Sequence, residues 1–283
     1  MFKKRLFNLL ITTALLLSSA AICQAKTVTF AVASGTQYSA ETNPNHKNYT
    51  LGSKVLRGFI DRVNENNYDF VVFLGDNINK SQKKTLNSFL NVIKGINVPY
   101  YLVMGDQDVH KISGIAKPEY LQAVTENSRY QTKKENSFIF YPDKELAVIV
   151  LDNVSTAMPS THGAFTEKTL KWLDTTLIKN KKKKVIIFQH VPYIEPYEKY
   201  SHSLLEKTDY AAIIKRHENV LAVISGHYNQ DYMIKDEKGI YHICAPAMVD
   251  TPFDYQEITV KYDKTPFSKA KNFKIEKTLK PAI

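Results

Sequence analysis

The chain has 283 residues, of which 43% are hydrophobic and 23% charged, an ordinary composition for a globular protein with a sizeable core. Lysines and arginines number 38 against 28 aspartates and glutamates, but they are not interleaved with aromatic residues in a nucleic-acid-binding motif. Of the two cysteines, Cys23 is expected to leave with a leader and Cys244 to remain, which excludes an intramolecular disulfide.

Residues 1–25 have the layout of a secretory signal peptide. Three basic residues at positions 3–5 precede an apolar stretch at residues 9–17, and small residues lead to a cleavage site expected after Ala25. An uncleaved membrane anchor is the alternative, but the apolar stretch is shorter than the roughly 20 residues that span a bilayer. We therefore expect an exported protein, periplasmic or secreted, whose mature chain keeps 35 of the 38 basic residues and does not lie in a membrane.

The first half of the mature chain alternates between strand and helix patterns. Strands are expected at residues 27–33, 70–74 and 100–104, because these are short apolar runs rich in β-branched residues. Apolar residues at helical spacing predict helices at residues 54–66 and around residues 86–93. A β-α-β-α-β order implies parallel strands joined by crossovers.

The second half adds more strands and fewer helices. No internal repeat, low-complexity linker or domain boundary interrupts it, so residues 26–283 are expected to form a single α/β domain of two sheets flanked by helices. The expected helices lie near residues 119–126, after Thr166, and near residues 210–216. The expected strands are residues 137–141, 145–151, 185–188, 221–225, 231–235, 240–244, 256–262 and an edge strand near 273–275.

Four of the expected strands end in a side chain that can bind a metal. The carboxyl ends of strands in an open α/β sheet are the edge where ligands bind, so these four side chains are expected to converge. Carboxylates and imidazoles are the usual protein ligands of Zn²⁺, Mn²⁺ and Fe²⁺. The four residues, in chain order, are Asp76, Asp106, His190 and His227.

These strand-end motifs occur in the order typical of a known family, and the chain resembles the calcineurin-like metallophosphoesterases from about residue 27 to residue 260. The family pattern is Asp-x-His, Gly-Asp, Gly-Asn-His-Asp/Glu, a histidine often followed by proline, and Gly-His-x-His. The resemblance implies a two-sheet α/β sandwich that hydrolyses phosphate mono- or diesters with two metals. In this chain the family's metal-bridging aspartate corresponds to Asp76.

The chain departs from the family pattern on one side of the site. Gly35, Gln37 and Asn229 stand where the family has ligands of its first metal, so that only the bridging Asp76 remains there. The second metal's ligands are all present, with Asp106 in place of an asparagine. We therefore expect a degenerate first site and one divalent metal, manganese, zinc or iron.

The chemistry of such a site is expected to be weaker than that of the family. Gln107 replaces the histidine that the family is thought to use to protonate the leaving group, and glutamine cannot transfer a proton. One dication with two carboxylates also has no net charge, so it lowers the pKa of bound water less than a bridged pair would. Gln107 and Asn229 are expected to contact the substrate, and no residue is assigned a catalytic role.

Three functions remain open at this point. The first is an exported phosphoric-ester hydrolase with a reduced, single-metal site and a small phosphate-ester substrate. The second is a catalytically inactive member of the same family that keeps one structural metal and binds a partner or a polyanion. The third is a basic surface binder that uses residues 181–184, although a lysine run between a helix and a strand is more often a solvated loop.

Other polar and aromatic residues have alternative roles. Asp108 and Asp231 are possible replacement ligands if their loops fold inward, and Gln37 and Asn229 offer carbonyl oxygens to a hard cation such as Mg²⁺. An aromatic loop after His190 either lines a substrate pocket or lies on the surface, and its residues are Tyr193, Tyr197 and Tyr200. Surface or core positions are expected for the remaining histidines, which are His110, His162, His202, His217 and His242.

Overall fold

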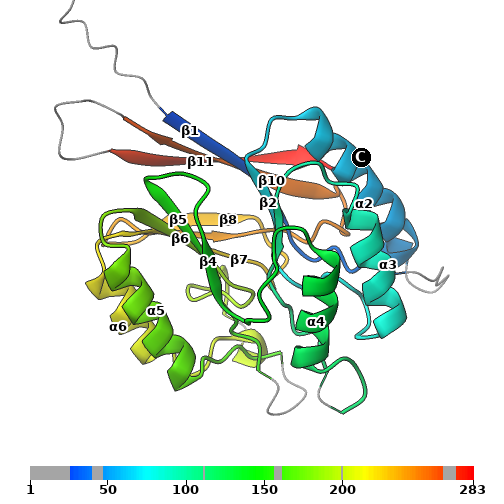
Figure 1. The fold of residues 1–283 in the computed structure, drawn as a ribbon, viewed down its shortest axis with the longest axis horizontal. Helices are drawn as coiled ribbons and strands as arrows, with labels where there is room; N and C mark the ends of the chain where they lie inside the picture. Colours follow the sequence, from blue (N-terminus) through cyan, green and yellow to red (C-terminus); the bar gives the residue numbers. More distant parts are fainter. Residues whose placement is uncertain (1–25, 40–46, 111, 156–160, 199, 264–271) are drawn as a thin grey trace, which may run out of the picture.

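The computed structural model describes residues 26–39, 47–110, 112–155, 161–198, 200–263 and 272–283. Its strands form two sheets that pack face to face, with helices on both outer faces (Figure 1). The predicted signal peptide, residues 1–25, lies outside the described residues. Within the described ranges no helix is both long enough and apolar enough to cross a bilayer.

The first sheet has the strand order β11-β10-β1-β2-β3. Its parallel centre is β1 (Lys26–Ala33), β2 (Phe70–Phe73) and β3 (Tyr100–Leu102), and its antiparallel edge is β10 (Asp254–Tyr262) and β11 (Phe273–Pro281). The helices that join or follow the parallel strands are α2 (Lys47–Glu65), α3 (Lys83–Ile93) and α4 (Lys117–Asn127). They lie together on one side of the molecule (Figure 1).

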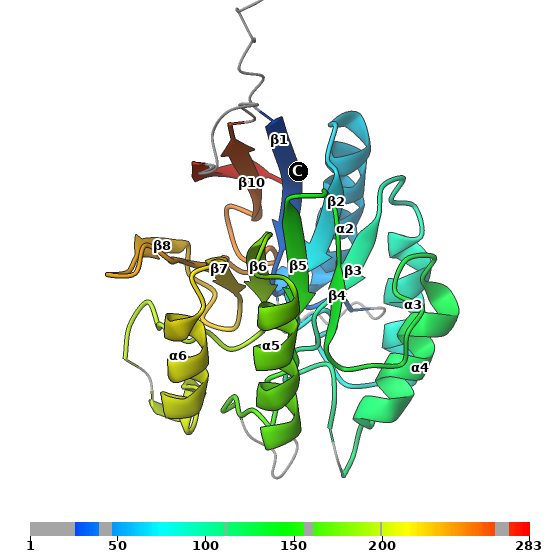
Figure 2. The same ribbon diagram turned by 60° about the vertical axis from the view of Figure 1, so that its left-hand side comes forward.

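The second sheet has the strand order β4-β5-β6-β7-β9-β8. Its parallel strands are β5 (Leu146–Val150), β6 (Lys184–Phe188), β7 (Val220–Ser225) and β9 (Tyr241–Cys244), and its antiparallel edges are β4 (Phe138–Phe140) and β8 (Tyr232–Lys235). Helices α5 (Glu167–Lys179) and α6 (Lys207–Arg216) cover its outer face, and a short 3₁₀ turn, η1 (Tyr200–His202), precedes α6 (Figure 2).

The core is layered in the same way as the secondary structure. Phe30 of β1 stacks on Phe70 of β2 at 4.5 Å and meets Phe188 of the second sheet at 5.8 Å, between ring centroids. The alternate β2 residues, Val71 and Phe73, pack in the cluster beneath α2 and α3. Because β2 is buried on both faces, its sequence is an unbroken apolar run rather than an alternating one.

The expected fold class is confirmed, with two differences at the ends of elements. The edge strand β11 covers nine residues and pairs with all of β10, whereas the sequence predicted a strand only near residues 273–275. Its lysines and glutamates obscured the strand pattern, and such charges are typical of an exposed edge strand. Helix α2 begins at Lys47, before the expected residue 54, because its first turns are polar and carry little apolar periodicity.

Candidate metal centre

The carboxyl ends of β2, β3, β6 and β7 meet at one end of the sandwich. The loops after β2 and β3 approach each other so closely that Gly75 has no room for a side chain: a Cβ atom there would lie 2.5 Å from His190 Nδ1 and 2.7 Å from the Cα of Gly105. Gly75 also has φ +87°, a conformation that favours glycine. The glycine before Asp76 therefore brings its carboxylate against the other strand ends.

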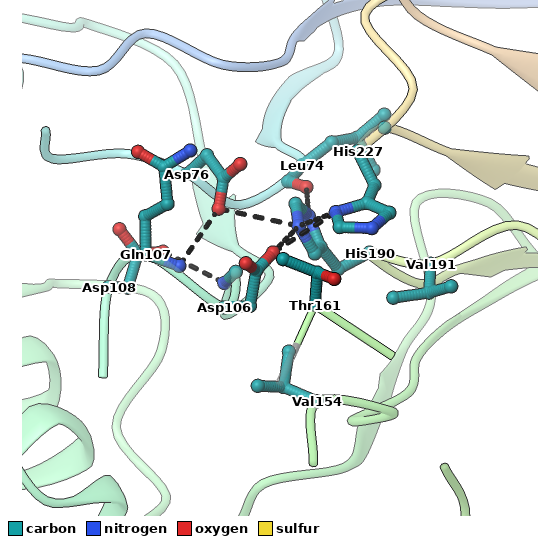
Figure 3. Close-up of polar contacts among 12 residues, drawn as sticks. Leu74, Asp76, Asp106, Gln107, Asp108, Val154, Thr161, His190, Val191 and His227 are labelled. Atoms are coloured by element: carbon teal, nitrogen blue, oxygen red, sulfur yellow. Dashed lines mark hydrogen bonds and ion pairs between the residues drawn. The ribbon is translucent and has the colours of Figure 1, made fainter. Parts of the chain in front are cut away.

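The structure brings all four expected ligand residues together. One ligand atom from each of Asp76, Asp106, His190 and His227 lies within 4.8 Å of the other three (Figure 3). His190 Nε2 is 2.9 Å from Asp106 Oδ1 and 3.3 Å from Asp76 Oδ1. His227 Nδ1 is 3.0 Å from the same Asp106 oxygen and 3.1 Å from His190 Nε2. The geometric condition for one shared ion is thus met.

The two imidazoles present their nitrogen atoms to each other and to carboxylates. His190 Nδ1 lies 2.7 Å from the carbonyl oxygen of Leu74, which fixes the proton on Nδ1 and leaves Nε2 directed at the cluster. Two nitrogens that face each other at 3.1 Å beside two acidic oxygens need a positive charge between them. Either a proton or a metal ion supplies that charge.

The pKa values in the cluster reflect this demand for positive charge. Burial would lower the pKa of His190, but the carboxylates of Asp76 and Asp106 outweigh it and raise the pKa to about 9. Burial would raise the pKa of Asp106, and hydrogen bonds with His190 and His227 instead hold it well below its usual range. The pKa of Asp76 is raised, chiefly because its carboxyl group is buried. Without a metal, the cluster retains a proton on His190.

The donor set fits a divalent transition metal. Ligand atoms held about 2.1 Å from one ion lie roughly 3–4 Å apart, so the cluster needs only a small contraction to hold it. Two carboxylate oxygens and two imidazole nitrogens suit zinc, manganese or iron, and they would balance the charge of one dication. Asp76, Asp106, His190 and His227 are the residues that would hold the ion.

Asp108 has a different role from the one considered for it. Its Oδ1 accepts hydrogen bonds from the backbone N–H groups of Asn77 and Ile78, at 2.7 and 3.0 Å. Its Oδ2 accepts from the side chain of Asn77 and the backbone of Gly105, both at 2.8 Å. Asp108 is fully buried and ties the loop after β2 to the loop after β3. The suggestion that it replaces a lost ligand is therefore wrong.

Asp231 is not a replacement ligand either. Its Oδ1 accepts a hydrogen bond from Gln256 at 2.8 Å and pairs with the ammonium of Lys277, away from the cluster.

Gln107 lies at the cluster, and its backbone N–H donates to Asp76 Oδ1 at 3.1 Å. Gln107 is also among the residues that line the pocket at the cluster.

Gly35, Gln37 and Asn229, which the resemblance placed at the first metal, lie in a closely packed part of the structure. A Cβ atom at Gly35, which has φ +52°, would lie 2.9 Å from Ala247 Cβ and 3.3 Å from Asn229 Oδ1. That Asn229 oxygen is buried and has no hydrogen-bond partner in the described part of the chain. Gln37 is also buried, and its backbone N–H donates to the carbonyl of Asp76 at 2.9 Å. The three changed positions therefore lie beside the cluster.

A pocket of about 310 Å³ opens at the cluster, and three of the four ligand residues line it, namely Asp76, Asp106 and His227. One residue of the aromatic loop after His190, Tyr197, lines this pocket, which was one of the two alternatives for that loop. The Tyr197 ring centroid lies 5.1 Å from that of Tyr228. Tyr193 instead packs against Tyr210, with their ring centroids 5.5 Å apart. The side chain of Tyr200 is outside the description.

His202 is a pocket residue that the sequence did not reveal. It lies in η1, lines the pocket, and places its ring centroid 5.0 Å from that of His227. The sequence predicted a surface or core position for it, because no strand precedes it and no motif surrounds it. Thr161, from the loop before α5, joins it in the lining (Figure 3).

Comparisons with known proteins agree with the fold and the motifs. A family model described as calcineurin-like phosphoesterase matches residues 50–230. A probable glycerophosphodiester phosphodiesterase of Arcobacter nitrofigilis is 24% identical over 165 residues, which are 57% of this chain and 57% of that protein. A probable cyclic nucleotide phosphodiesterase of Moraxella catarrhalis is 26% identical over 172 residues, 58% of this chain and 59% of that protein.

The chain thus spans less than two thirds of the length of either relative. Among solved structures, a dimetal phosphatase from Danio rerio has a TM-score of 0.65 at 17% identity, with 87% of this chain and 98% of that one covered, which shows a common fold. The family match takes in more than half of the residues, and all four strand ends described above lie within it. The chain belongs to the calcineurin-like phosphoesterase family.

Proposed function

We propose that this protein is an exported phosphoric-ester hydrolase that works with one divalent metal. The observation that carries the proposal is the convergence of two carboxylates and two imidazoles, three of which line a pocket, in a chain of a phosphoesterase family. Export is proposed from the signal-peptide pattern of residues 1–25 alone.

A bound metal would supply a Lewis acid for a phosphoryl oxygen and a water of lowered pKa. The chain's own residues would orient the ester. Gln107 and Asn229 stay our candidates for substrate contacts, and Thr161 and His202 join them because they line the same pocket. His202 has ring nitrogen atoms that could donate a hydrogen bond to an ester oxygen.

The packing around Gly35 supports a reduced site. A ligand side chain there would need a Cβ atom 2.9 Å from Ala247 Cβ, closer than real Cβ contacts, and a left-handed backbone that disfavours it. Asn229 offers an oxygen in place of an imidazole, so the neighbouring metal position has lost both its charge and its nitrogen donors. One metal per chain is the expected content.

We propose diesters ahead of monoesters as substrates. The pocket lining contains Asp76, Asp106 and Asp250, and no lysine or arginine among the described residues. With one dication bound, the lining stays slightly negative, which disfavours a monoester dianion more than a diester monoanion. The two curated relatives reported above are both named as phosphodiesterases, which agrees with this order.

The test is to measure metal content and turnover together. The chain is expressed in media enriched in manganese, zinc or iron, its metal is measured by elemental analysis, and bis-(p-nitrophenyl) phosphate and p-nitrophenyl phosphate are offered as substrates. About one metal per chain and faster hydrolysis of the diester are expected. His227→Ala should abolish both metal and turnover, whereas His217→Ala, which alters an imidazole paired with Asp174 away from the site, should preserve them.

An inactive binding protein is the second candidate. The replacement of a proton-transferring imidazole by Gln107, together with the packed first-metal side, favours it. One metal per chain with no hydrolysis of either ester in manganese, zinc, iron or magnesium would select this candidate over the first. Two metals per chain would contradict the reduced site in both.

A further inference from the structure

The end of the sandwich opposite the candidate metal centre carries a cluster of five lysines, of which three are exposed and two, Lys183 and Lys184, are partly buried. Lys181–Lys184 join α5 to β6, and Lys144 lies in the turn between β4 and β5. The two segments are neighbours, because Lys184 N donates to the carbonyl of Glu145 at 2.9 Å and the Lys183 ammonium contacts the carbonyl of Lys144. We call these five lysines the lysine end.

The charges of the lysine end are largely unneutralised. None of the five lysines is in an ion pair with a carboxylate in the described part of the chain, and the Lys184 ammonium contacts a backbone carbonyl, that of Glu218, at 2.7 Å. A shallow concavity of about 260 Å³ holds Lys181–Lys184 against only two glutamates, Glu145 and Glu218. Such a surface is complementary to an array of anions.

The candidate metal centre does not account for this charge. The lysine end lies at the amino ends of β5 and β6, and the four ligand residues lie beyond the carboxyl ends of the strands. His190 lies six residues after Lys184, which is roughly 20 Å of extended chain. That span is more than two Debye lengths at physiological salt, so the lysines act only weakly on the pocket.

An exposed aromatic residue accompanies the lysines. Tyr141, at the end of β4, is 53% exposed, and the Lys183 ammonium lies 5.4 Å above its ring centroid. Amphipathic rings beside cations are characteristic of surfaces that contact lipid headgroups, where the ring sits at the boundary and the ammonium groups meet phosphates. A duplex nucleic acid would gain little from one isolated ring.

The chain also enters the fold at this end. Lys26, the first residue of β1, pairs with Tyr262 in the sheet, and Asp143 contacts the side chains of both. Asp143 and Lys144 are in the same turn, and Figure 2 shows that turn and the start of β1 toward one end of the molecule. The first described residue of the chain, Lys26, therefore lies at the same end of the molecule as the lysine end.

We propose that the lysine end docks on the anionic phospholipid headgroups of a bilayer, with the metal-site pocket facing away from the membrane. Each lysine near an anionic membrane surface is worth roughly a fivefold increase in partitioning. Four such lysines would therefore strengthen binding by on the order of 10²-fold or more, and salt would weaken it. The proposal does not depend on the metal or on catalysis.

The test is sedimentation of the full chain with lipid vesicles. One set is phosphatidylcholine alone, and the other contains one third phosphatidylglycerol. In the lysine-end variant four residues are changed to glutamine, namely Lys144, Lys181, Lys182 and Lys183. The matched control removes the same charge from exposed lysines elsewhere, namely Lys54, Lys133, Lys134 and Lys168. Equal urea midpoints of the three proteins establish that the exposed substitutions leave the fold intact.

The lysine-end variant is expected to lose at least tenfold in partitioning onto the anionic vesicles, while the control variant binds like the unchanged chain. Tyr141→Ser should weaken binding to the same vesicles severalfold. Equal loss in both lysine variants would reduce the effect to net charge and overturn the proposal. So would equal binding to both vesicle sets, or binding to a DNA duplex without binding to the anionic vesicles.

Discussion

Asp108→Asn tests whether the buried carboxylate beneath the site holds the two ligand loops together. Asparagine has the same shape, but only one of its two polar atoms is an acceptor. If its oxygen keeps the bonds from the backbone of Asn77 and Ile78, its amide group faces two N–H donors, those of the Asn77 side chain and Gly105. Both bonds to Oδ2 are then lost: the Gly105 N–H is buried without an acceptor, and the Asn77 amide keeps only the Val103 carbonyl and the Tyr120 hydroxyl.

The magnitude follows from those two contacts. A hydrogen bond to a charged group contributes about 1.5–3 kcal/mol, so two of them amount to roughly 3–6 kcal/mol. Typical domains have a free energy of unfolding of about 5–15 kcal/mol, which makes this a large loss. In a chain of this size it corresponds to a fall in Tm on the order of 10 °C.

Urea unfolding of the metal-free chain measures the stability loss, and Asp61→Asn, which removes an exposed carboxylate from α2, is the control. Metal affinity is expected to fall about 10–100-fold as well, because Asp108 positions the loops of Asp76 and Asp106 without touching the cluster. A change in unfolding free energy below about 1 kcal/mol would refute this role for Asp108.

Three further outcomes follow from the structure. Gly35→Ala should destabilise the fold by about 1–3 kcal/mol in urea unfolding, since its Cβ would meet Ala247 in a left-handed conformation, and adding Ala247→Gly should recover part of the loss. If position 107 is where a proton donor acts on the leaving group, Gln107→His should raise diester turnover by about 10²-fold. Unchanged turnover would contradict that role for position 107. Burial would raise the pKa of Asp143, but the hydrogen bond from Lys26 lowers it overall. Asp143→Asn should therefore reduce stability by about 1–3 kcal/mol above pH ~4, and the difference should shrink as pH falls further, because protonation removes that stabilisation from the unchanged chain too.

The sequence predicted the strands and their polar ends because both signals are local. An apolar run such as residues 70–74 is visible by itself, and the carboxylate that follows Gly75 is placed by the strand before it. Parallel strands of one sheet align their carboxyl ends, which places Asp76 beside Asp106 and His190 beside His227. The packing of the two sheets against each other then brings the two pairs together, and no local pattern encodes that step.

Other features were hidden because they depend on tertiary packing. Asp106 and Asp108 are two residues apart and look equivalent in the sequence, yet one faces the cluster and the other accepts four hydrogen bonds beneath it. His202 reaches the pocket through a long loop whose path no periodic pattern describes. The length of β11 was hidden for a simpler reason, since its residues are charged and only its pairing with β10 makes it a strand.

The placement of the changed residues bears on how the site works. Gly35 and Asn229 come from opposite ends of the chain, yet a Cβ atom at Gly35 would lie 3.3 Å from the Asn229 oxygen. Gly35 and Asn229 therefore lie in one contiguous region, in which Ala247 packs against Gly35. His190 and His227 direct their nitrogen atoms at two carboxylates. In the single-metal site that we propose, packing leaves no room for a ligand side chain at position 35, so Gly35→Asp alone should not raise the metal content above one per chain in elemental analysis.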